Sequence, residues 1–149
     1  MMRYAINLWG PFIGAGIKVI SVNKDFTRIE VALRERFYNQ NIVGVHFGGS
    51  LYAMCDPFYM GILLHHLGRD FIVWDKGANI KFKKPGKGTV TAVFEISADE
   101  INRLRSEALA NPKVEPVFKA MIRDANGVVV AEVEKTLYIK SKSKSTAAA

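Results

Sequence analysis

Cysteine and histidine are scarce in this chain, and neither is arranged as a disulfide framework or a metal site. The single cysteine, Cys55, has no partner, and the three histidines show no metal-ligand spacing. The most apolar stretch, residues 51–64, is interrupted by Asp56 and Pro57 and is shorter than the about 20 residues that cross a bilayer. We therefore expect no metal, no disulfide and no membrane span. Because no leader-like segment begins the chain, we expect a cytoplasmic protein.

The positive charge of the chain is modest once its C-terminal end is set aside. The net charge is +7, and removing the three lysines of segment 140–149 leaves +4. This excess falls short of the basic patch of nucleic-acid-binding proteins, so we expect no nucleic-acid partner and favour a small polyanionic ligand. Segment 141–149 alternates Ser with Lys and ends in Thr-Ala-Ala-Ala. We predict a single domain over residues 1–140 and a disordered basic tail over 141–149.

Residues 51–64 predict a buried central helix, since apolar side chains cover every face. Pro57 lacks an N–H and is expected to bend this helix. Asp56 is the only charged residue in the stretch, and a buried carboxylate must be paired, protonated or turned toward a polar cleft. Asp56 is therefore the first catalytic candidate. The alternative, that Asp56 only accepts hydrogen bonds that fix packing, is equally open.

Runs of alternating or β-branched residues on both sides of this helix predict an antiparallel sheet. We expect strands over residues 16–23, 26–33, 71–74, 80–84, 89–96, 114–124 and 128–140. The pair Asn126-Gly127 between two of these runs is a strong hairpin signal. The fold class is therefore α+β, with an antiparallel β-sheet wrapped around a central buried helix.

Two further helices are expected outside the core. A short leading helix within residues 3–13 should be broken at Trp9-Gly10-Pro11, and an amphipathic surface helix should run over residues 97–108 after a polar start. Gly68 has the position of a C-terminal stop for the central helix.

A spaced set of residues lies at the start of the central helix: Asn41, the pair Gly48-Gly49, and Asp56 seven residues after Gly49. Together with the order of the elements, this pattern resembles the hotdog-fold acyl-CoA thioesterases, and most closely a poorly characterised branch of them. The resemblance covers nearly the whole chain. It implies the hotdog fold, hydrolysis of an acyl-CoA or related acyl thioester, and no cofactor except the coenzyme A of the substrate.

The resemblance also implies roles for individual residues. Gly49 matches the backbone donor to the thioester oxygen, Asp56 the catalytic carboxylate, as general base or nucleophile, and Asn41 a residue that shapes the mouth of the site. A glycine N–H at a helix N-terminus has no intrahelical partner, which agrees with the first role. Further substrate contacts are expected at His46, Phe47, Gly48, Tyr52, Tyr59, Lys83 and Lys84.

Phe47 is a departure from this family pattern, because many relatives have histidine immediately before the Gly-Gly pair. His46 lies one residue earlier. A non-catalytic module that binds acyl-CoA or an acyl chain on the same fold is therefore the alternative function. Hydration or dehydration of an acyl thioester would need a well-placed histidine beside a carboxylate, and Phe47 argues against it.

Gly49 and Asp56 are too far apart along one helix to act on the same atom. Seven helical positions put them on roughly one face but about 10 Å apart along the axis. We therefore expect at least a homodimer, or a dimer of dimers, in which Gly49 of one chain works with Asp56 of the other.

Overall fold

The computed structural model describes residues 6–144 and contains one six-stranded antiparallel sheet of order β1-β2-β4-β5-β6-β3. The elements are α2 (Gly10–Ala15), β1 (Ile17–Val22), β2 (Arg28–Arg34), α3 (Gly48–Ala53), α4 (Phe58–Leu67), β3 (Phe71–Phe82), β4 (Thr89–Glu95), α5 (Ala98–Ala110), β5 (Val117–Arg123), β6 (Val129–Ser141) and the 3-10 helix η1 (Lys142–Lys144). The predicted antiparallel sheet is confirmed.

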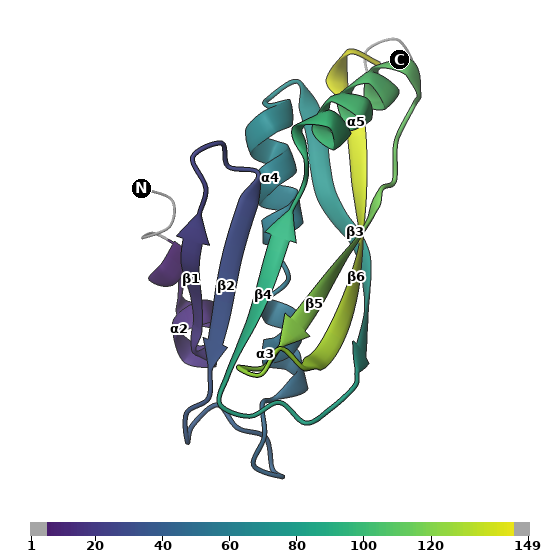
Figure 1. The fold of residues 1–149 in the computed structure, drawn as a ribbon. Coiled ribbons are helices and arrows are strands. Elements are labelled where there is room, and N and C mark those ends of the chain that lie inside the picture. The colour runs from purple at the N-terminus through teal and green to yellow at the C-terminus, as the bar shows by residue number, and fades with distance from the viewer. Residues whose placement is uncertain (1–5, 145–149) are drawn as a thin grey trace.

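The sheet curves around α3 and α4, and α5 lies at the end of the molecule opposite α3 (Figure 1). Alternate strand positions point toward these helices, so that Val31 and Leu33 of β2 are fully buried. Ile62 and Leu63 of α4 belong to the same core cluster. Each such side chain contributes about 1.5–3 kcal/mol when it leaves water, which makes α4 the centre of the fold.

The buried helical segment is two helices, so the prediction of one helix over 51–64 is wrong in this respect. α3 ends at Ala53, and α4 begins at Phe58 with Pro57 as its N-cap residue. The N–H of Asp56 bonds to the carbonyl of Ala53 at 3.3 Å, a three-residue turn in place of the helical pattern. Asp56 therefore lies in a turn between the helices.

β3 is a single strand, although two shorter strands around a turn at 75–79 were predicted. It pairs with β6 from Phe71 opposite Ser141 to Phe82 opposite Ala131, with a register shift between Asp75 and Gly77. The Asp-Lys-Gly-Ala-Asn sequence has turn chemistry, but pairing along the whole of β6 overrides that local preference. Lys76, between Asp75 and Gly77, is the extra residue of a β-bulge.

Most predicted turns and helix ends are present. Gly127 has φ 78° in the β5–β6 hairpin, and Gly68, with φ 78°, ends α4. α5 begins at Ser97, whose hydroxyl accepts a hydrogen bond from the N–H of Glu100. The leading helix is interrupted at Leu8 and Trp9, close to the predicted break. A second helix, α2, then begins at Gly10, and Pro11 lies in its first turn, where a proline needs no N–H partner.

Regular structure extends past residue 141, the predicted start of the tail. Ser141 is the last residue of β6 and is buried, and the N–H of Lys142 donates to the carbonyl of Asp70 at 2.9 Å. Residues 145–149, also assigned to the tail, lie outside the described residues. No helix between residues 6 and 144 is long and apolar enough to cross a membrane.

Candidate functional site

The Gly48-Gly49 pair forms the first turn of α3, as predicted, with Phe47 as N-cap residue. Neither glycine N–H has a hydrogen-bond partner among residues 6–144, whereas the N–H of Ser50 bonds to the Phe47 carbonyl at 3.0 Å. A Cβ at Gly48 would lie 2.9 Å from Cζ of Phe82, and a Cβ at Gly49 would collide with the Phe47 ring. A larger residue at either position would therefore have to displace one of the two aromatic rings that flank the turn.

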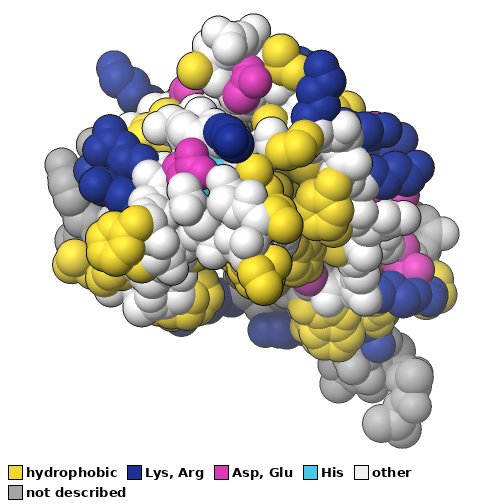
Figure 2. Space-filling model, turned by 90° about the horizontal axis from the view of Figure 1, so that it is seen from below, with side chains coloured by type: hydrophobic (Ala, Val, Ile, Leu, Met, Phe, Trp, Pro, Cys, Tyr) yellow, Lys and Arg dark blue, Asp and Glu magenta, His cyan; other side chains and the backbone are white. Residues whose placement is uncertain are grey.

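A cavity of about 440 Å³ opens beside this turn. Its lining residues are Asn41, Val45, His46, Gly48, Leu51, Phe82, Lys83, Lys84, Pro85 and Gly86. The structure therefore brings five of the predicted substrate contacts, Asn41, His46, Gly48, Lys83 and Lys84, to one cavity. Figure 2 looks onto this end of the molecule, where hydrophobic side chains gather among basic ones.

Asn41 closes a tight loop at this cavity. Its side-chain oxygen accepts hydrogen bonds from the N–H groups of Val43 at 3.1 Å and Val45 at 3.2 Å. The N–H of Gly44 bonds to the Asn41 carbonyl, and Gly44 has φ 73°, a conformation that favours glycine. Asn41 thus shapes the loop that leads into α3. Its role at the mouth of the site stays a prediction.

His46 is buried and clamps two loops together. Its Nε2 lies 2.8 Å from the carbonyl oxygen of Gly88, and its backbone N–H donates to the Gly86 carbonyl. A carbonyl only accepts, so Nε2 carries the hydrogen of that bond. The other ring nitrogen, Nδ1, is buried without a partner among the described residues. The imidazole is a fixed part of the cavity wall.

The remaining predicted substrate contacts near the cavity differ in their exposure to solvent and in whether they already have an ion-pair partner. Phe47 is 55% exposed and Phe82 is 56% exposed, so both rings face solvent beside the glycines. Lys83 already has a carboxylate partner, Glu132 on β6, at 2.9 Å. Lys84 has no ion pair among the described residues, which leaves its charge available to a ligand.

Asp56 belongs to a second cluster, built around Lys135. The Lys135 side chain is fully buried, and its Nζ lies 2.8 Å from Oδ1 of Asp56, 3.0 Å from Oδ2 of Asp75 and 3.2 Å from the hydroxyl of Tyr52. The Tyr52 hydroxyl donates to the same Oδ1 of Asp56 at 3.0 Å. The register of β3 against β6 explains why Asp75 contacts Lys135. Asp75 pairs with Leu137 and therefore lies diagonal to Lys135 on the inner face of the sheet.

Electrostatics fix the charge of the lysine. Burial lowers the pKa of Lys135, but hydrogen bonds to Asp56, Asp75 and Tyr52 outweigh it and raise the pKa to about 12. Burial raises the pKa of the Asp75 carboxyl against the opposing effect of Lys135, and Oδ1 of Asp75 is buried without a partner among the described residues. Burial also raises the pKa of Tyr52, which keeps its phenol a hydrogen-bond donor.

The two oxygens of Asp56 therefore differ. Oδ1 is held by Lys135 and Tyr52, whereas Oδ2 has no hydrogen-bond partner among residues 6–144. The side chain of Asp56 is 46% exposed, so the carboxylate lies between a buried ammonium and solvent. This arrangement orients one oxygen and leaves the other open to a water molecule or a substrate.

Lys135 and Asp75 were not among the predicted site residues. A signal for Lys135 exists in β6, where the inward positions Val133, Leu137 and Ile139 alternate with polar residues. Lys135 occupies an inward position of that same alternation, and a lysine there must find buried partners. The lysine could therefore have been singled out from its strand register alone.

Tyr59 lies in the core, away from the cavity. Its ring stacks on Phe118 at 4.8 Å, and its hydroxyl donates to the carbonyl of Lys119 at 2.7 Å. Its role as a substrate contact stays a prediction. Cys55 is also buried, which raises the pKa of its thiol to about 12 and keeps it protonated.

Gly48 lines the cavity, whereas neither Gly49 nor Asp56 is among its lining residues. The cavity beside Gly48 has no lining residue in common with the cluster of Tyr52, Asp56, Asp75 and Lys135. Among the residues that the structure describes, no group of three or more His, Cys, Asp and Glu side chains could hold a metal ion.

Solved structures with this fold include several thioesterases. The Pseudomonas aeruginosa protein PA5026, of unknown function and described as a probable thioesterase, matches with TM-score 0.81 at 21% identity over 93% of both chains. The Haemophilus influenzae thioesterase HI1161 matches with TM-score 0.65 at 15% identity, over 92% of this chain and 87% of that chain. A Q32A mutant of the Staphylococcus aureus thioesterase SAV0944 matches with TM-score 0.63 at 16% identity, over 87% and 97%. At these identities the likeness shows a shared fold.

Comparison with curated proteins gave no match. The family model described as domain of unknown function DUF4442 matches residues 1–139. The match spans almost the whole chain and includes both the Gly-Gly turn and the Lys135 cluster. The chain therefore belongs to the DUF4442 family.

Proposed function

We propose that this protein has the hotdog fold and hydrolyses an acyl-CoA or a related acyl thioester. The observation that supports this most is the asymmetry of Asp56, with Oδ1 fixed by Lys135 and Tyr52 and Oδ2 open. The thioesterases that share the fold support the same reaction class.

Asp56 acts as the base or the nucleophile, and both routes stay open. As a base, its Oδ2 takes a proton from water while the water oxygen attacks the thioester carbon. As a nucleophile, Oδ2 attacks that carbon itself and forms an anhydride, which water then hydrolyses. In both routes the C–S bond breaks, the thiolate leaves and takes up a proton, and the products are a carboxylic acid and a free thiol.

The Gly49 N–H stabilises the oxygen that becomes negative when the thioester carbon is attacked. It is free in the described chain, and glycine lets the acyl group approach closely. Phe47 and Phe82 form apolar walls on either side of the turn. Lys84, without an ion pair, is the better placed of the two predicted lysines for a coenzyme A phosphate.

No histidine takes part in this chemistry at the Gly-Gly turn. Phe47 occupies the position where the resemblance leads one to expect histidine. His46 cannot replace it, because its Nε2 is engaged by Gly88 and its ring is buried. The reaction therefore depends on a carboxylate and a backbone N–H.

The complete site contains Gly49 from one chain and Asp56 from another. β3 is an edge strand of the sheet, and both half-sites adjoin it: Phe82 lines the cavity and Asp75 contacts Lys135. Residues 76–79 between them are exposed. A two-fold axis near Ala78 would bring Phe82 of one chain beside Asp75 of its partner, and the two half-sites with them.

A non-catalytic module that binds acyl-CoA is the second candidate. The observation that favours it is the pair of exposed rings, Phe47 and Phe82, at a turn without an available imidazole. Measuring binding and hydrolysis on one panel of acyl-CoA chain lengths separates the candidates, since a binding module retains affinity with no release of free thiol.

Asp56→Asn should fold normally and lose at least about a hundredfold in turnover, the lower range for removal of a positioned acid-base group. The measurement is release of free thiol from an acyl-CoA panel, with melting temperature as the test of folding. Asp70→Asn is the matched control, because Asp70 is an exposed carboxylate in the turn after α4. Unchanged turnover in Asp56→Asn would end the catalytic assignment.

Lys135→Met should lower both stability and turnover. Removing one partner of a buried ion pair costs about 3–5 kcal/mol, and the partial exposure of Asp56 favours the lower end. The double variant Lys135→Met/Asp75→Asn removes the buried charge that loses its partner, so most of the lost melting temperature should return. Turnover should stay about ten- to a hundredfold low, because Asp56 is no longer held in place. Full activity in the double variant would contradict a positioning role for Lys135.

Complementation between two inactive variants tests the shared site. One partner is Asp56→Asn, and the other is Gly49→Pro in a Phe47→Ala background, since any Cβ at Gly49 meets the Phe47 ring. Random pairing after joint refolding makes half the dimers mixed, each with one intact site that uses Gly49 and Phe47 of the Asp56→Asn chain, so activity should return to about a quarter of that of the wild type. A mixture that stays inactive would show that each site lies within one chain.

A further inference from the structure

A groove of about 890 Å³ lies along one end of β1, β2 and β4, bounded on one side by α2. Lys18, Ala32, Arg34, Thr89 and Thr91 line it from the sheet. These positions alternate with buried residues of the same strands, so they form the outer face of the sheet, away from α3 and α4. The groove has no lining residue in common with the cavity beside Gly48.

The strand register places two cations, Lys18 and Arg34, beside the small side chain of Ala32. Lys18 pairs with Ala32, and Ala32 pairs with Thr91. Arg34 follows Ala32 on the same face and pairs with Thr89. Lys18 and Arg34 are therefore diagonal neighbours, about 7–8 Å apart at the backbone, with only the methyl group of Ala32 between them. Side chains at that separation can both reach one phosphate, and neither threonine hydroxyl has a partner among the described residues.

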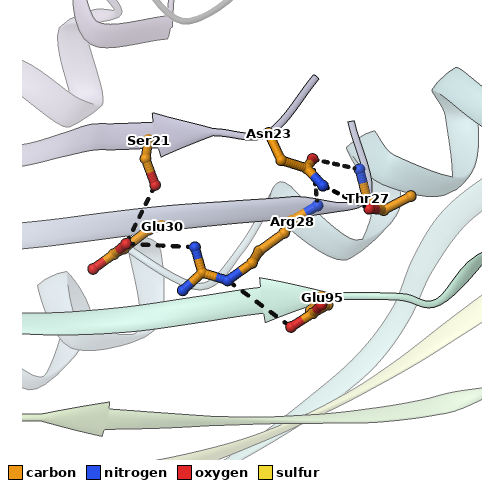
Figure 3. Close-up of polar contacts among 6 residues, drawn as sticks. All are labelled: Ser21, Asn23, Thr27, Arg28, Glu30 and Glu95. Atoms are coloured by element: carbon orange, nitrogen blue, oxygen red, sulfur yellow. Dashed lines mark hydrogen bonds and ion pairs between the residues drawn. The ribbon is translucent and has the colours of Figure 1, made fainter. Parts of the chain in front are cut away.

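The charges on this face are balanced at its far end and unbalanced in the groove. At the far end, Arg28 lies 3.6 Å from Glu30 and 3.9 Å from Glu95, as Figure 3 shows. In the groove, Lys18, Arg34 and Arg36 have no ion pair among residues 6–144, and no acidic residue lines the groove. Three cations without counter-charges create a positive potential that attracts an anion.

Aliphatic side chains lie next to these cations. Leu8, just before α2, is 75% exposed, and Ile13, within α2, is 54% exposed. Ile20 of β1 is also exposed. All three line the groove. Exposed aliphatic carbon is unfavourable in water, so covering it would favour a ligand with an apolar tail.

We propose that this groove binds an amphiphile with a phosphate head group and an aliphatic tail. The phosphate lies between Lys18 and Arg34, within reach of Arg36, and the tail covers Leu8, Ile13 and Ile20. A nucleotide would offer the same phosphate chemistry and could stack on Tyr38, which also lines the groove, but the three exposed aliphatic side chains fit an alkyl chain better than a purine. This site is independent of the proposed thioesterase chemistry.

The test is a calorimetric titration of the full chain with dodecyl phosphate, at concentrations below its critical micelle concentration. Inorganic phosphate, dodecyl maltoside and adenosine 3′,5′-bisphosphate serve as head-only, tail-only and nucleotide probes. We expect one molecule of dodecyl phosphate per chain and at least about tenfold weaker binding of each other probe. Lys18→Gln/Arg34→Gln should weaken dodecyl phosphate binding at least about tenfold, because two charge-assisted contacts are lost.

Arg28→Gln is the matched control, since it removes a cation from the same face whose charge is already balanced, and its binding should equal that of the wild type. Melting temperatures show that each variant is folded. Four results would each overturn the proposal: no binding to wild type, unchanged binding in the double variant, equal binding of dodecyl maltoside, or tighter binding of the bisphosphate. Asp56→Asn should bind normally, which separates this site from the catalytic one.

Discussion

The buried ammonium group of Lys135 is the constraint on which the candidate site depends. A charged nitrogen inside a sheet must be surrounded by acceptors, and here these come from three elements: Tyr52 of α3, Asp56 of the turn after it, and Asp75 of β3. The lysine therefore ties the helical layer to the edge of the sheet. It also holds the turn at Asp56, whose Oδ1 lies 2.8 Å from the Lys135 ammonium.

The interruption between α3 and α4 has a local and a distant cause. Pro57 cannot donate a hydrogen bond, which removes one helical contact, and Lys135 then engages the carboxylate of the residue before it. The bulge in β3 follows the same pattern, because Asp75 immediately precedes the register shift and contacts Lys135 on the adjacent strand β6. The turn between α3 and α4 and the bulge in β3 are far apart along the chain, but both lie next to a carboxylate that contacts Lys135.

The elements that were predicted correctly are those whose signals are local. The Asn126-Gly127 hairpin, the stop at Gly68 and the cap at Ser97 need only a few neighbouring residues, and all three are present. The continuity of β3 was missed because its turn-like centre is overridden by β6, about 60 residues away in sequence. Lys135 was missed for a related reason: its importance lies in its inward register, while its residue type suggested an exposed position.

The glycine pattern and the carboxylate could be found from sequence, but their relation could not. Sequence spacing treats residues 41–56 as one motif, whereas the structure divides them into a cavity that contains Gly48 and a cluster that contains Asp56. His46 illustrates the same limit, since a shift of one residue turns its ring into the protein to hold Gly88 while Phe47 faces solvent. If Asp56 and Gly49 act together as proposed, the edge strand β3 is the element that both half-sites share, because it borders each of them and its residues 76–79 are exposed. In the proposed site, a second chain pairs with that edge and completes the constellation.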